Sequence, residues 1–254
     1  MSEALVQRFR AARRDRELAL LEGFHALKHA LRFGAELVEA VAVDPDELDR
    51  LAADLAPDLA GSLAGRLTPV DADELGRMVP HAPRTGTVAI ARRPAVDVAA
   101  ALAEERPAPV VLLEDPRTMG NMGACVRVAA AADAAALLTT GDNDPWSPEA
   151  LRGAAGLHFA LPVASVTGPP RGDRPLVAVD PDGDPVSPRE LEPRCVLAFG
   201  TERHGLSEEL LARADARLAI PMREGVSSLN LATAVAAVLY AMPKTTDAAG
   251  REDE

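Results

Sequence analysis

The chain has 254 residues, 48% of them apolar and 26% charged, which is the composition of a globular protein long enough for one large domain or two smaller ones. Its 27 basic side chains stand against 39 acidic ones, so the formal net charge is −12. A protein coated uniformly with positive charge is therefore excluded, although a localised basic site is not. All basic residues except Lys28 and Lys244 are arginine, a bias that suits phosphate binding and that a GC-rich genome would also produce.

The cysteines and the N-terminus indicate a cytoplasmic protein. Cys125 and Cys195 lie far apart with no CxxC motif and no histidine pair nearby, so we expect two buried apolar side chains rather than a disulfide or a metal site. The N-terminus lacks the apolar core of a signal peptide, and no apolar run reaches the roughly 20 residues that a membrane span needs. We therefore expect no membrane partner and no metal.

The first 17 residues form a basic N-terminal helix or arm. Between Arg8 and Arg16 five arginines stand against one aspartate, against the acidic trend of the whole chain. Two interpretations remain open, an arm that contacts RNA or the solvated face of a helix. The candidate RNA-binding residues are Arg8, Arg10, Arg13, Arg14 and, further along the chain, Arg84.

Residues 18–94 are predicted to form a small α/β domain. The spacing of Leu18, Leu21, Ala26, Leu27 and Leu31 predicts a helix, and Asp44-Pro45 predicts the start of another. The remaining predicted elements are strands at 38–43, 66–70 and 87–92 and helices at 44–55 and 71–78. Residues 95–108, rich in Ala, Glu and Pro, are predicted to be a linker with a short helix.

Residues 109–243 are predicted to form a second α/β domain with longer apolar strands. Alternating strands and helices are typical of a mostly parallel sheet with helices on both faces, in which ligands bind at the carboxyl ends of the strands. The predicted strands are 110–114, 135–139, 160–166, 176–179, 196–199 and 217–220, and the predicted helices are 121–132, 148–155, 207–213 and 228–242. Residues 244–254 are predicted to be a disordered acidic tail.

Two loops that follow apolar strands contain glycines beside polar residues. The loop 114–127, EDPRTMGNMGACVR, has neither GxGxxG nor GxxxxGK[ST], so a dinucleotide or P-loop site gains little support. Its Asn121 and Arg127 stand at the start of a helix in the spacing NxGxxxR. The loop 197–207 places Glu202 between Gly200 and Gly205, and Gly200 would let a ligand approach the chain closely.

A third loop, 218–230, leads from a strand into a helix of small residues. We expect that helix to start at Ser228 to Asn230 and to pack closely, either in the core or against a second copy of the chain.

Together the three loops resemble the TrmH (SpoU) family of the SPOUT superfamily, which are S-adenosylmethionine-dependent RNA 2′-O-ribose methyltransferases. The matching motifs are NMGACVR (121–127), GTERHG (200–205) and IPM…SSLNLA (220–232), in this order and each after a strand. The resemblance covers residues 109–243. A weaker one, through EGFHALKHAL (22–31) and RTGTVAIA (84–91), relates residues 18–94 to RNA-binding domains of the ribosomal-protein L30e type.

The resemblance implies a fold, a cofactor and a partner. The fold would contain a deep trefoil knot, which periodicity could not have revealed because knots are very rare. Family members are homodimers that bind S-adenosylmethionine in the knot, mainly through backbone groups. Carried onto this chain, the cofactor-binding residues are Thr139, Thr140, Gly200, Ile220, Met222 and Leu229.

The family also implies which residues take part in the reaction. Arg127 matches an arginine that is proposed to help deprotonate the ribose 2′-hydroxyl. A guanidinium with a pKa above about 12 is a poor base, so stabilising the forming alkoxide and gripping a phosphate are physically easier roles. Asn121 and Glu202 are expected to orient Arg127 or the ribose, and Ser228 and Asn230 to shape the catalytic loop.

Structured RNA, and 23S rRNA before tRNA, is the expected substrate. Three alternatives stay open: a tRNA 2′-O-methyltransferase, a non-catalytic RNA-binding or ribosome-assembly protein on the same scaffold, and a nucleotide-dependent oxidoreductase. The missing dinucleotide fingerprint disfavours the last of these.

Overall fold

A computed structural model describes the chain except for residues 1–2, 60, 64, 185–186, 202–203 and 244–254. The chain divides into two compact units. The first contains Met1–Ala95 and Trp146–Ala160, and the second contains Val96–Pro145 and Leu161–Glu254. These units differ from the predicted domains because residues 146–160 belong to the first unit and the predicted linker belongs to the second.

The first unit is built on a mixed sheet of four strands in the order β1-β4-β2-β3. Strands β1 and β2 run antiparallel to β4, whereas β3 runs parallel to β2. Their bounds are β1 Leu18–Glu22, β2 Leu37–Ala42, β3 Thr68–Pro69 and β4 Thr87–Arg92. The helix predicted from Leu18 is therefore wrong in its first half. Leu18–Glu22 is a strand buried on both faces, and its continuous apolar run cannot be distinguished from a helix by periodicity. Gly23, at φ +91°, ends the strand, and the helix begins at Phe24.

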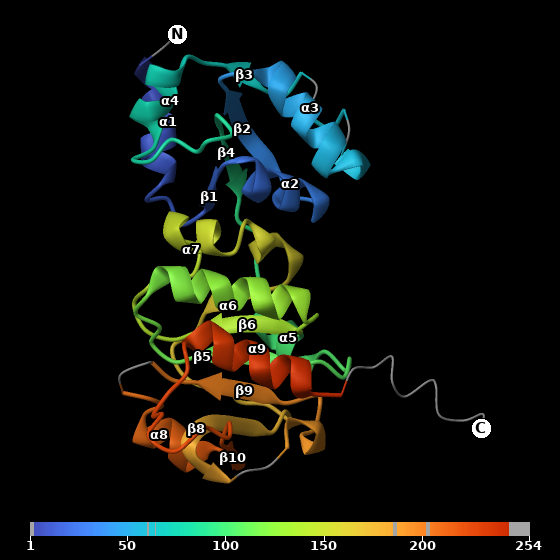
Figure 1. Cartoon of the computed structure of the whole chain (residues 1–254), viewed down its shortest axis with the longest axis vertical. Coiled ribbons are helices and arrows are strands. Elements are labelled where there is room, and N and C mark those ends of the chain that lie inside the picture. Colours follow the sequence, from blue (N-terminus) through green and yellow to red (C-terminus); the bar gives the residue numbers. More distant parts are fainter. Residues whose placement is uncertain (1–2, 60, 64, 185–186, 202–203, 244–254) are drawn as a thin grey trace, which may run out of the picture. The chain divides into compact units, whose positions relative to one another are not determined.

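Helices cover the sheet of the first unit (Figure 1). They are α1 Glu3–Ala12, α2 Phe24–Arg32, α3 Pro45–Leu55 and α4 Ala72–Met78, with a 3₁₀ turn at Pro57–Leu59. The predicted caps are confirmed: Asp44 accepts from the Glu47 N–H, and Asp71 and Glu74 form a capping box. Helix α1 buries Phe9 and its neighbours against β1, β2, β4 and α4, so the basic N-terminal segment is a helix of the core rather than a separate arm.

The inserted segment 146–160 completes the first unit. Helix α7, Pro148–Gly153, packs on β1, and a 3₁₀ helix at Leu157–Ala160 packs on α2. A ring nitrogen of His29 lies 2.7 Å from the Ala155 carbonyl oxygen, and Arg13 and Arg152 both pair with the carboxylate of Glu22. These contacts explain why the predicted helix at 148–155 is not part of the second unit.

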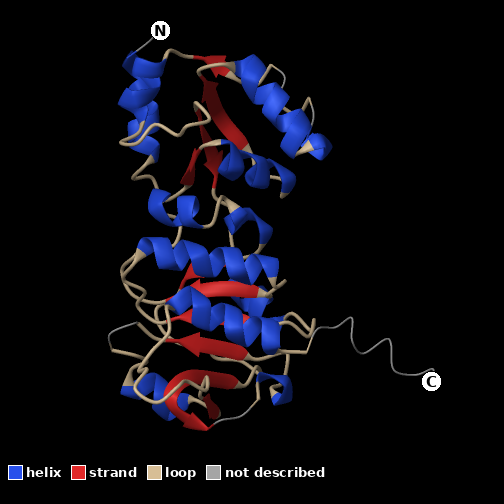
Figure 2. Cartoon of the chain, in the orientation of Figure 1, coloured by secondary structure: helices blue, strands red, loops and turns tan. Residues whose placement is uncertain are grey.

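The second unit contains a sheet of six parallel strands in the order β10-β8-β9-β5-β6-β7 (Figure 2). The predicted parallel α/β sheet is thus confirmed. The strands are β5 Val110–Leu113, β6 Ala136–Thr139, β7 Val163–Ser165, β8 Leu176–Asp184, β9 Val196–Phe199 and β10 Ala216–Leu218. All residues of β5, β6 and β9 are buried, as expected for strands covered on both faces.

Two pairs of helices cover the two faces of this sheet (Figure 1). One face is covered by α5, Val98–Ala103, and α8, Glu208–Arg213. These helices pack on Val110 and Leu112 and on the side chains of neighbouring strands that point to the same face. Successive residues of a strand point to opposite faces, so Val111 and Leu113 face the other layer. That layer consists of α6, Met119–Ala131, and α9, Leu231–Ala241, which pack against each other. A third 3₁₀ turn lies at Pro188–Glu190.

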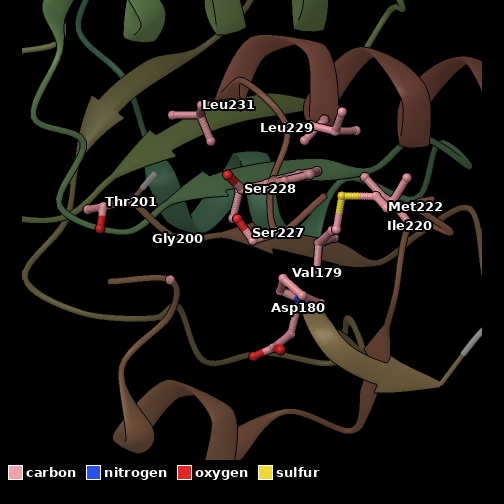
Figure 3. Close-up of a pocket in the computed structure, with 14 residues that line it drawn as sticks. Val179, Asp180, Gly200, Thr201, Ile220, Met222, Ser227, Ser228, Leu229 and Leu231 are labelled. Atoms are coloured by element: carbon pink, nitrogen blue, oxygen red, sulfur yellow. The ribbon is translucent and has the colours of Figure 1, made fainter. Parts of the chain in front are cut away.

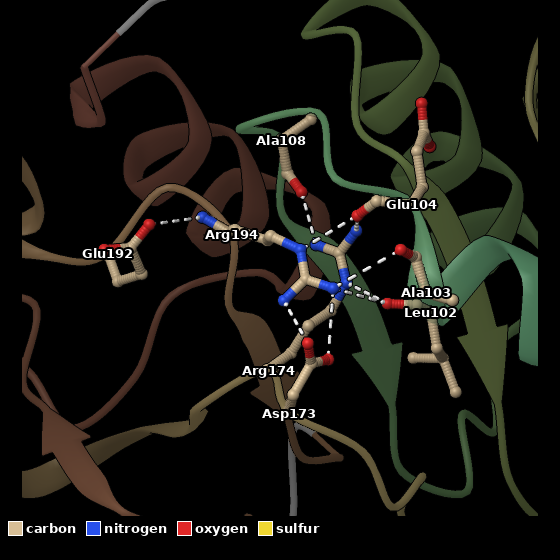
Figure 4. Close-up of polar contacts among 8 residues, drawn as sticks. All are labelled: Leu102, Ala103, Glu104, Ala108, Asp173, Arg174, Glu192 and Arg194. Atoms are coloured by element: carbon tan, nitrogen blue, oxygen red, sulfur yellow. Dashed lines mark hydrogen bonds and ion pairs between the residues drawn. The ribbon is translucent and has the colours of Figure 1, made fainter.

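Two arginines fasten the predicted linker to the second unit (Figure 4). The Arg174 side chain is buried and donates hydrogen bonds of 2.7 to 2.8 Å to the carbonyl oxygens of Leu102, Glu104 and Ala108. Arg194 donates to Glu104 and forms an ion pair of 3.0 Å with Asp173. Residues 102–108 are therefore a fixed part of the second unit.

Candidate functional site

The loops that carry the sequence motifs meet at one edge of the parallel sheet. They follow β5, β9 and β10, and all three leave the carboxyl ends of their strands, where ligands bind in such sheets. The loops after β9 and β10 lie beside Val179 and Asp180 of β8. A cavity of about 180 Å³ opens among them.

This hollow, which we call the cofactor cavity because residues predicted to bind the cofactor line it, has apolar walls and a few polar groups (Figure 3). Ile220 and Met222 lie together beside Val179, and Ser227 and Ser228 lie across from them. The principal lining residues are Val179, Asp180, Phe199, Gly200, Thr201, Ile220, Met222, Ser227, Ser228, Leu229 and Leu231. Four of the six predicted cofactor-binding residues, Gly200, Ile220, Met222 and Leu229, therefore line one cavity. An apolar hollow with few convergent polar groups is typical of a small-molecule site.

The other two predicted cofactor-binding residues lie elsewhere. The Thr139 side chain is fully buried, with its hydroxyl 3.4 Å from that of Ser165. The Thr140 hydroxyl accepts a hydrogen bond of 3.0 Å from the Asp115 N–H. Neither residue lines the cofactor cavity, because β6 lies two strands away from β9 in the sheet.

The sequence interpretation missed Asp180 and Ser227. Asp180 directly follows the predicted strand 176–179, so the rule that ligands sit at carboxyl ends could have identified it. Ser227 is adjacent to Ser228, a predicted site residue, and lines the same cavity.

The conformation of the loop after β9 requires glycine at position 200. A Cβ atom at this position would overlap the backbone of Gly205 and Leu206. The loop folds back through two hydrogen bonds between Thr201 and Gly205, of 3.1 and 3.0 Å. The expectation that Gly200 is small so that a ligand can approach is therefore incomplete, because the folded-back chain already requires glycine there. Glu202 lies outside the described residues, so its predicted role stays a prediction.

A hydrogen bond joins the first motif to the third. Asn230 is the N-cap of α9, and its Oδ1 accepts from the N–H groups of Ala232 and Thr233 at 3.0 and 3.3 Å. This capping fixes the orientation of the amide, so that Nδ2 faces Asn121 and donates to its Oδ1 at 3.1 Å. The predicted start of the helix at Ser228 shifts to Leu231, and Ser228 lines the cavity instead.

Arg127 lies in the second half of α6 and is exposed. Within the described part of the chain its guanidinium has no hydrogen-bond or ion-pair partner, and no hydrogen bond joins it to Asn121. Residues six apart in a helix are separated by about 120° around the axis, so Asn121 and Arg127 do not share a face. The expectation that Asn121 orients Arg127 directly is therefore not supported by this geometry.

The predicted RNA-binding arginines fall into two groups. Arg8 pairs with Glu39, Arg10 donates to the Arg77 carbonyl oxygen at 2.7 Å, and Arg13 pairs with Glu22 and Glu149. Arg14 and Arg84 are exposed, and no hydrogen bond or ion pair engages their guanidinium groups within the residues that the structure describes.

The two cysteines are buried and unpaired with each other, as predicted. Burial raises the pKa of Cys195 to about 12, so its thiol stays protonated at neutral pH. Among the described residues no group of three or more His, Cys, Asp or Glu side chains is arranged to hold a metal ion. No described helix is both long and apolar enough to cross a membrane.

Comparison with known proteins identifies the chain. The model of the SpoU rRNA Methylase family matches residues 108–240. An uncharacterized tRNA/rRNA methyltransferase of Mycobacterium bovis is 33% identical over 207 residues, which are 76% of this chain and 70% of that protein. The 23S rRNA (adenosine(1067)-2′-O)-methyltransferase of Streptomyces azureus is 27% identical, over 94% of this chain and 92% of its own length.

A solved structure agrees with these matches. The SpoU methyltransferase AviRb from Streptomyces viridochromogenes, in complex with the cofactor AdoMet, superposes with a TM-score of 0.76 and 25% identity, over 94% of this chain and 96% of that chain. The fold and the cavity thus define a methyltransferase domain. The chain belongs to the SpoU rRNA methylase family, as its motifs indicated.

Proposed function

We propose that the protein transfers a methyl group from S-adenosylmethionine to a ribose 2′-hydroxyl of structured RNA, and that this RNA is 23S rRNA. The observation that carries the proposal is the convergence of the motifs. The second and third motifs line one cavity at the carboxyl edge, and the bond between Asn121 and Asn230 ties the first motif to it. The RNA substrate places the reaction in the cytoplasm.

The chemistry of the cavity fits S-adenosylmethionine. Ile220, Met222 and Leu229 provide apolar surface for a base and a thioether chain, while the Ser227, Ser228 and Thr201 hydroxyls provide polar contacts. When bound, the cofactor supplies an electrophilic methyl group on a sulfonium centre. The protein must then align the ribose oxygen with that methyl group and exclude competing water.

Arg127 stabilises the negative charge that develops on the ribose 2′-oxygen and does not remove the proton of the 2′-hydroxyl. Its guanidinium is exposed and has no partner among the described residues, so it is available to a nucleic acid. An arginine keeps its proton at all ordinary pH values, so it favours the developing alkoxide electrostatically and holds the adjacent phosphate. The resemblance implies that Glu202 orients Arg127 or the ribose, and the hydrogen bond from Asn230 supports a positioning role for Asn121.

Three structural proposals accompany this function. The connection from β10, an edge strand, returns to α9, which packs on α6, and this path supports the trefoil knot of the family. The side chains of Thr233, Ala237 and Tyr240 are exposed along one stripe of α9, which supports a homodimer packed through this helix. The first unit serves as the L30e-like RNA-binding domain.

The direct test is methyl transfer by the full chain. Purified protein with radiolabelled S-adenosylmethionine should label 23S rRNA at one nucleotide, and ribose mapping should place the methyl group on the 2′-oxygen. The same assay with 16S rRNA and bulk tRNA should give background labelling. Labelling of tRNA alone would favour the tRNA alternative, and tight binding of cofactor and RNA without any transfer would favour the non-catalytic one.

A further inference from the structure

A second cavity lies at the same edge of the parallel sheet. Its volume is about 520 Å³, and it shares Thr201 and Gly205 with the cofactor cavity, so the two are contiguous. Arg117, Thr140, Thr167 and His204 also line it. The cofactor cavity accounts for none of these four side chains.

The turn that carries Arg117 is held in an unusual conformation. Asp115 has a φ of +45°, which a side chain other than glycine rarely adopts and which surrounding structure must enforce. The Thr140 hydroxyl accepts from the Asp115 N–H, and the Asn143 side chain donates to the Pro116 carbonyl oxygen, each at 3.0 Å. A Cβ atom on Gly141 would clash with the Asp115 carboxylate and lie 3.1 Å from its Cγ. Two hydrogen bonds from the loop after β6 and the close approach of Gly141 thus fix the turn.

This turn determines where the guanidinium of Arg117 lies. Nη2 pairs with the Asp115 carboxylate, while the other guanidinium nitrogens have no hydrogen-bond partner within the described residues. The side chain is 71% exposed. An exposed arginine ordinarily samples many rotamers, whereas this one is presented on a fixed turn as a planar cation at the wall of the cavity.

The charges around the cavity favour a base over a phosphate. Glu114, Asp115 and Glu209 line it together with Arg117, so a phosphate would meet more carboxylates than guanidinium groups. A nucleobase is uncharged, presents both donors and acceptors, and stacks on guanidinium planes and imidazole rings. The only aromatic ring among the described lining residues is His204, so the Arg117 plane is the main stacking surface.

We propose that the second cavity receives the base of the nucleotide to be methylated, and that Arg117, held in place by Asp115, is a substrate-positioning residue that stacks on this base. The ribose then lies at the wall formed by Thr201 and Gly205, next to the cofactor. This inference rests on the proposed function, because it assigns a subsite to the same reaction. It explains why the turn is rigid although it holds no part of the cofactor cavity.

The test compares the normal target with an RNA that lacks only the target base. The target nucleotide is first mapped with wild-type protein, and a failure at that stage would contradict the proposed function and not this inference. On intact RNA, Arg117→Ala should lower kcat/KM about tenfold, which is the usual effect of removing a side chain that stacks on one base. On RNA with an abasic target nucleotide, the wild type and Arg117→Ala should have equal kcat/KM. Cofactor affinity, measured by calorimetry, should be unchanged.

Two further variants, one control variant and a salt series distinguish stacking on a base from binding to a phosphate. Gly141→Ala should reproduce the effect of Arg117→Ala, because it displaces Asp115. Arg117→Lys should also lose activity, although it keeps the charge. Arg106→Ala is the matched control: Arg106 pairs with Asp133, which also has a positive φ, but it precedes β5 and so lies at the opposite edge. Arg106→Ala should leave kcat/KM on intact RNA at the wild-type value.

Either of two results would overturn the proposal. One is an equal loss for Arg117→Ala on intact and abasic RNA. The other is a difference of about 0.7 to 0.9 between Arg117→Ala and wild type in the slope of log affinity against log salt concentration, which would show that Arg117 binds a phosphate instead.

Discussion

The two units engage their arginines with different partners. In the first unit, Arg8 and Arg13 pair with carboxylates and Arg10 binds a backbone carbonyl, while the guanidinium groups of Arg14 and Arg84 are exposed without partners among the described residues. In the second unit, Arg174 and Arg194 bind carbonyl oxygens of the linker, and Arg127 is exposed with no partner among the described residues. The comparison shows that a count of arginines does not locate an RNA surface. What locates it is which guanidinium groups the fold leaves available.

The largest expected effect separates these two kinds of arginine. Arg127→Ala should lower methyl transfer about 10²–10³-fold, the usual loss when one group that stabilises developing charge is removed. Cofactor affinity and unfolding temperature should stay at the wild-type values. The measurement pairs single-turnover methyl transfer with calorimetric binding of S-adenosylmethionine.

Arg13→Ala is the counterpart in the first unit. It should leave the chemical step unchanged and lower the free energy of unfolding by up to about 1 kcal/mol, because Glu22 keeps its pair with Arg152. Trp146, the only tryptophan, belongs to this unit and reports its unfolding by fluorescence. If Arg13→Ala abolished methyl transfer, or Arg127→Ala only destabilised the fold, the distinction would fail.

A second prediction concerns Asn230, which has a capping role and a linking role. Asn230→Asp keeps an oxygen to cap α9 but replaces the Nδ2 donor by an oxygen that faces Asn121 Oδ1. We expect near wild-type stability and a five- to tenfold loss of methyl transfer, about the value of one hydrogen bond. Asn230→Ala should lose similar activity and in addition about 1 kcal/mol of stability. Full activity in the Asp variant would show that the link to Asn121 is incidental.

The available arginines of the first unit give the third prediction. The double variant Arg14→Ala, Arg84→Ala should weaken RNA binding severalfold and reduce the salt dependence of the affinity, by about 0.7 to 0.9 in the log-log slope for each phosphate that is no longer neutralised. Arg8→Ala, which removes an arginine already paired with Glu39, should not change the slope. Filter binding over a salt series measures both, and equal behaviour of the two variants would remove the first unit from the RNA interface.

The smallest expected effect is a pH dependence of the free energy of unfolding. Burial lowers the pKa of His29, whose ring binds the Ala155 carbonyl, below its ordinary value of about 6.5. The unfolded chain therefore binds this proton at a higher pH than the native one, so stability falls as the pH drops through about 6.5. His29→Gln does not titrate and should show a shallower decline between pH 7.5 and 5.5, followed by Trp146 fluorescence. Parallel curves for the two proteins would exclude His29 as the cause.

The sequence predicted the elements of both units closely, apart from the strand Leu18–Glu22 and the place of the helix at 148–155, and it predicted the cavity in the second unit. Apolar runs such as Val110–Leu113 and Val196–Phe199 are short and are followed by glycine-containing motif loops, so they were assigned as strands and the cavity around Gly200, Ile220 and Leu229 could be anticipated. Periodicity failed at Leu18–Glu22, because a strand buried on both faces has no alternation. The docking of α1, the exclusion of Thr139 from the cavity and the hydrogen bond between Asn121 and Asn230 depend on distant parts of the chain, which local patterns do not encode.

The segment 146–160 has a consequence for how the protein is made. The chain passes between the units three times, after residues 95, 145 and 160. Because α7 and the 3₁₀ helix at Leu157–Ala160 complete the first unit, that unit cannot finish folding when its first 95 residues leave the ribosome. It must wait until Val96–Pro145, about a third of the methyltransferase unit, and the segment Trp146–Ala160 have been synthesised, so nascent chains hold an unfinished N-terminal unit during that interval. A truncated gene ending near residue 95 should therefore yield an incomplete fold, and a transplant of the first unit would have to carry both pieces.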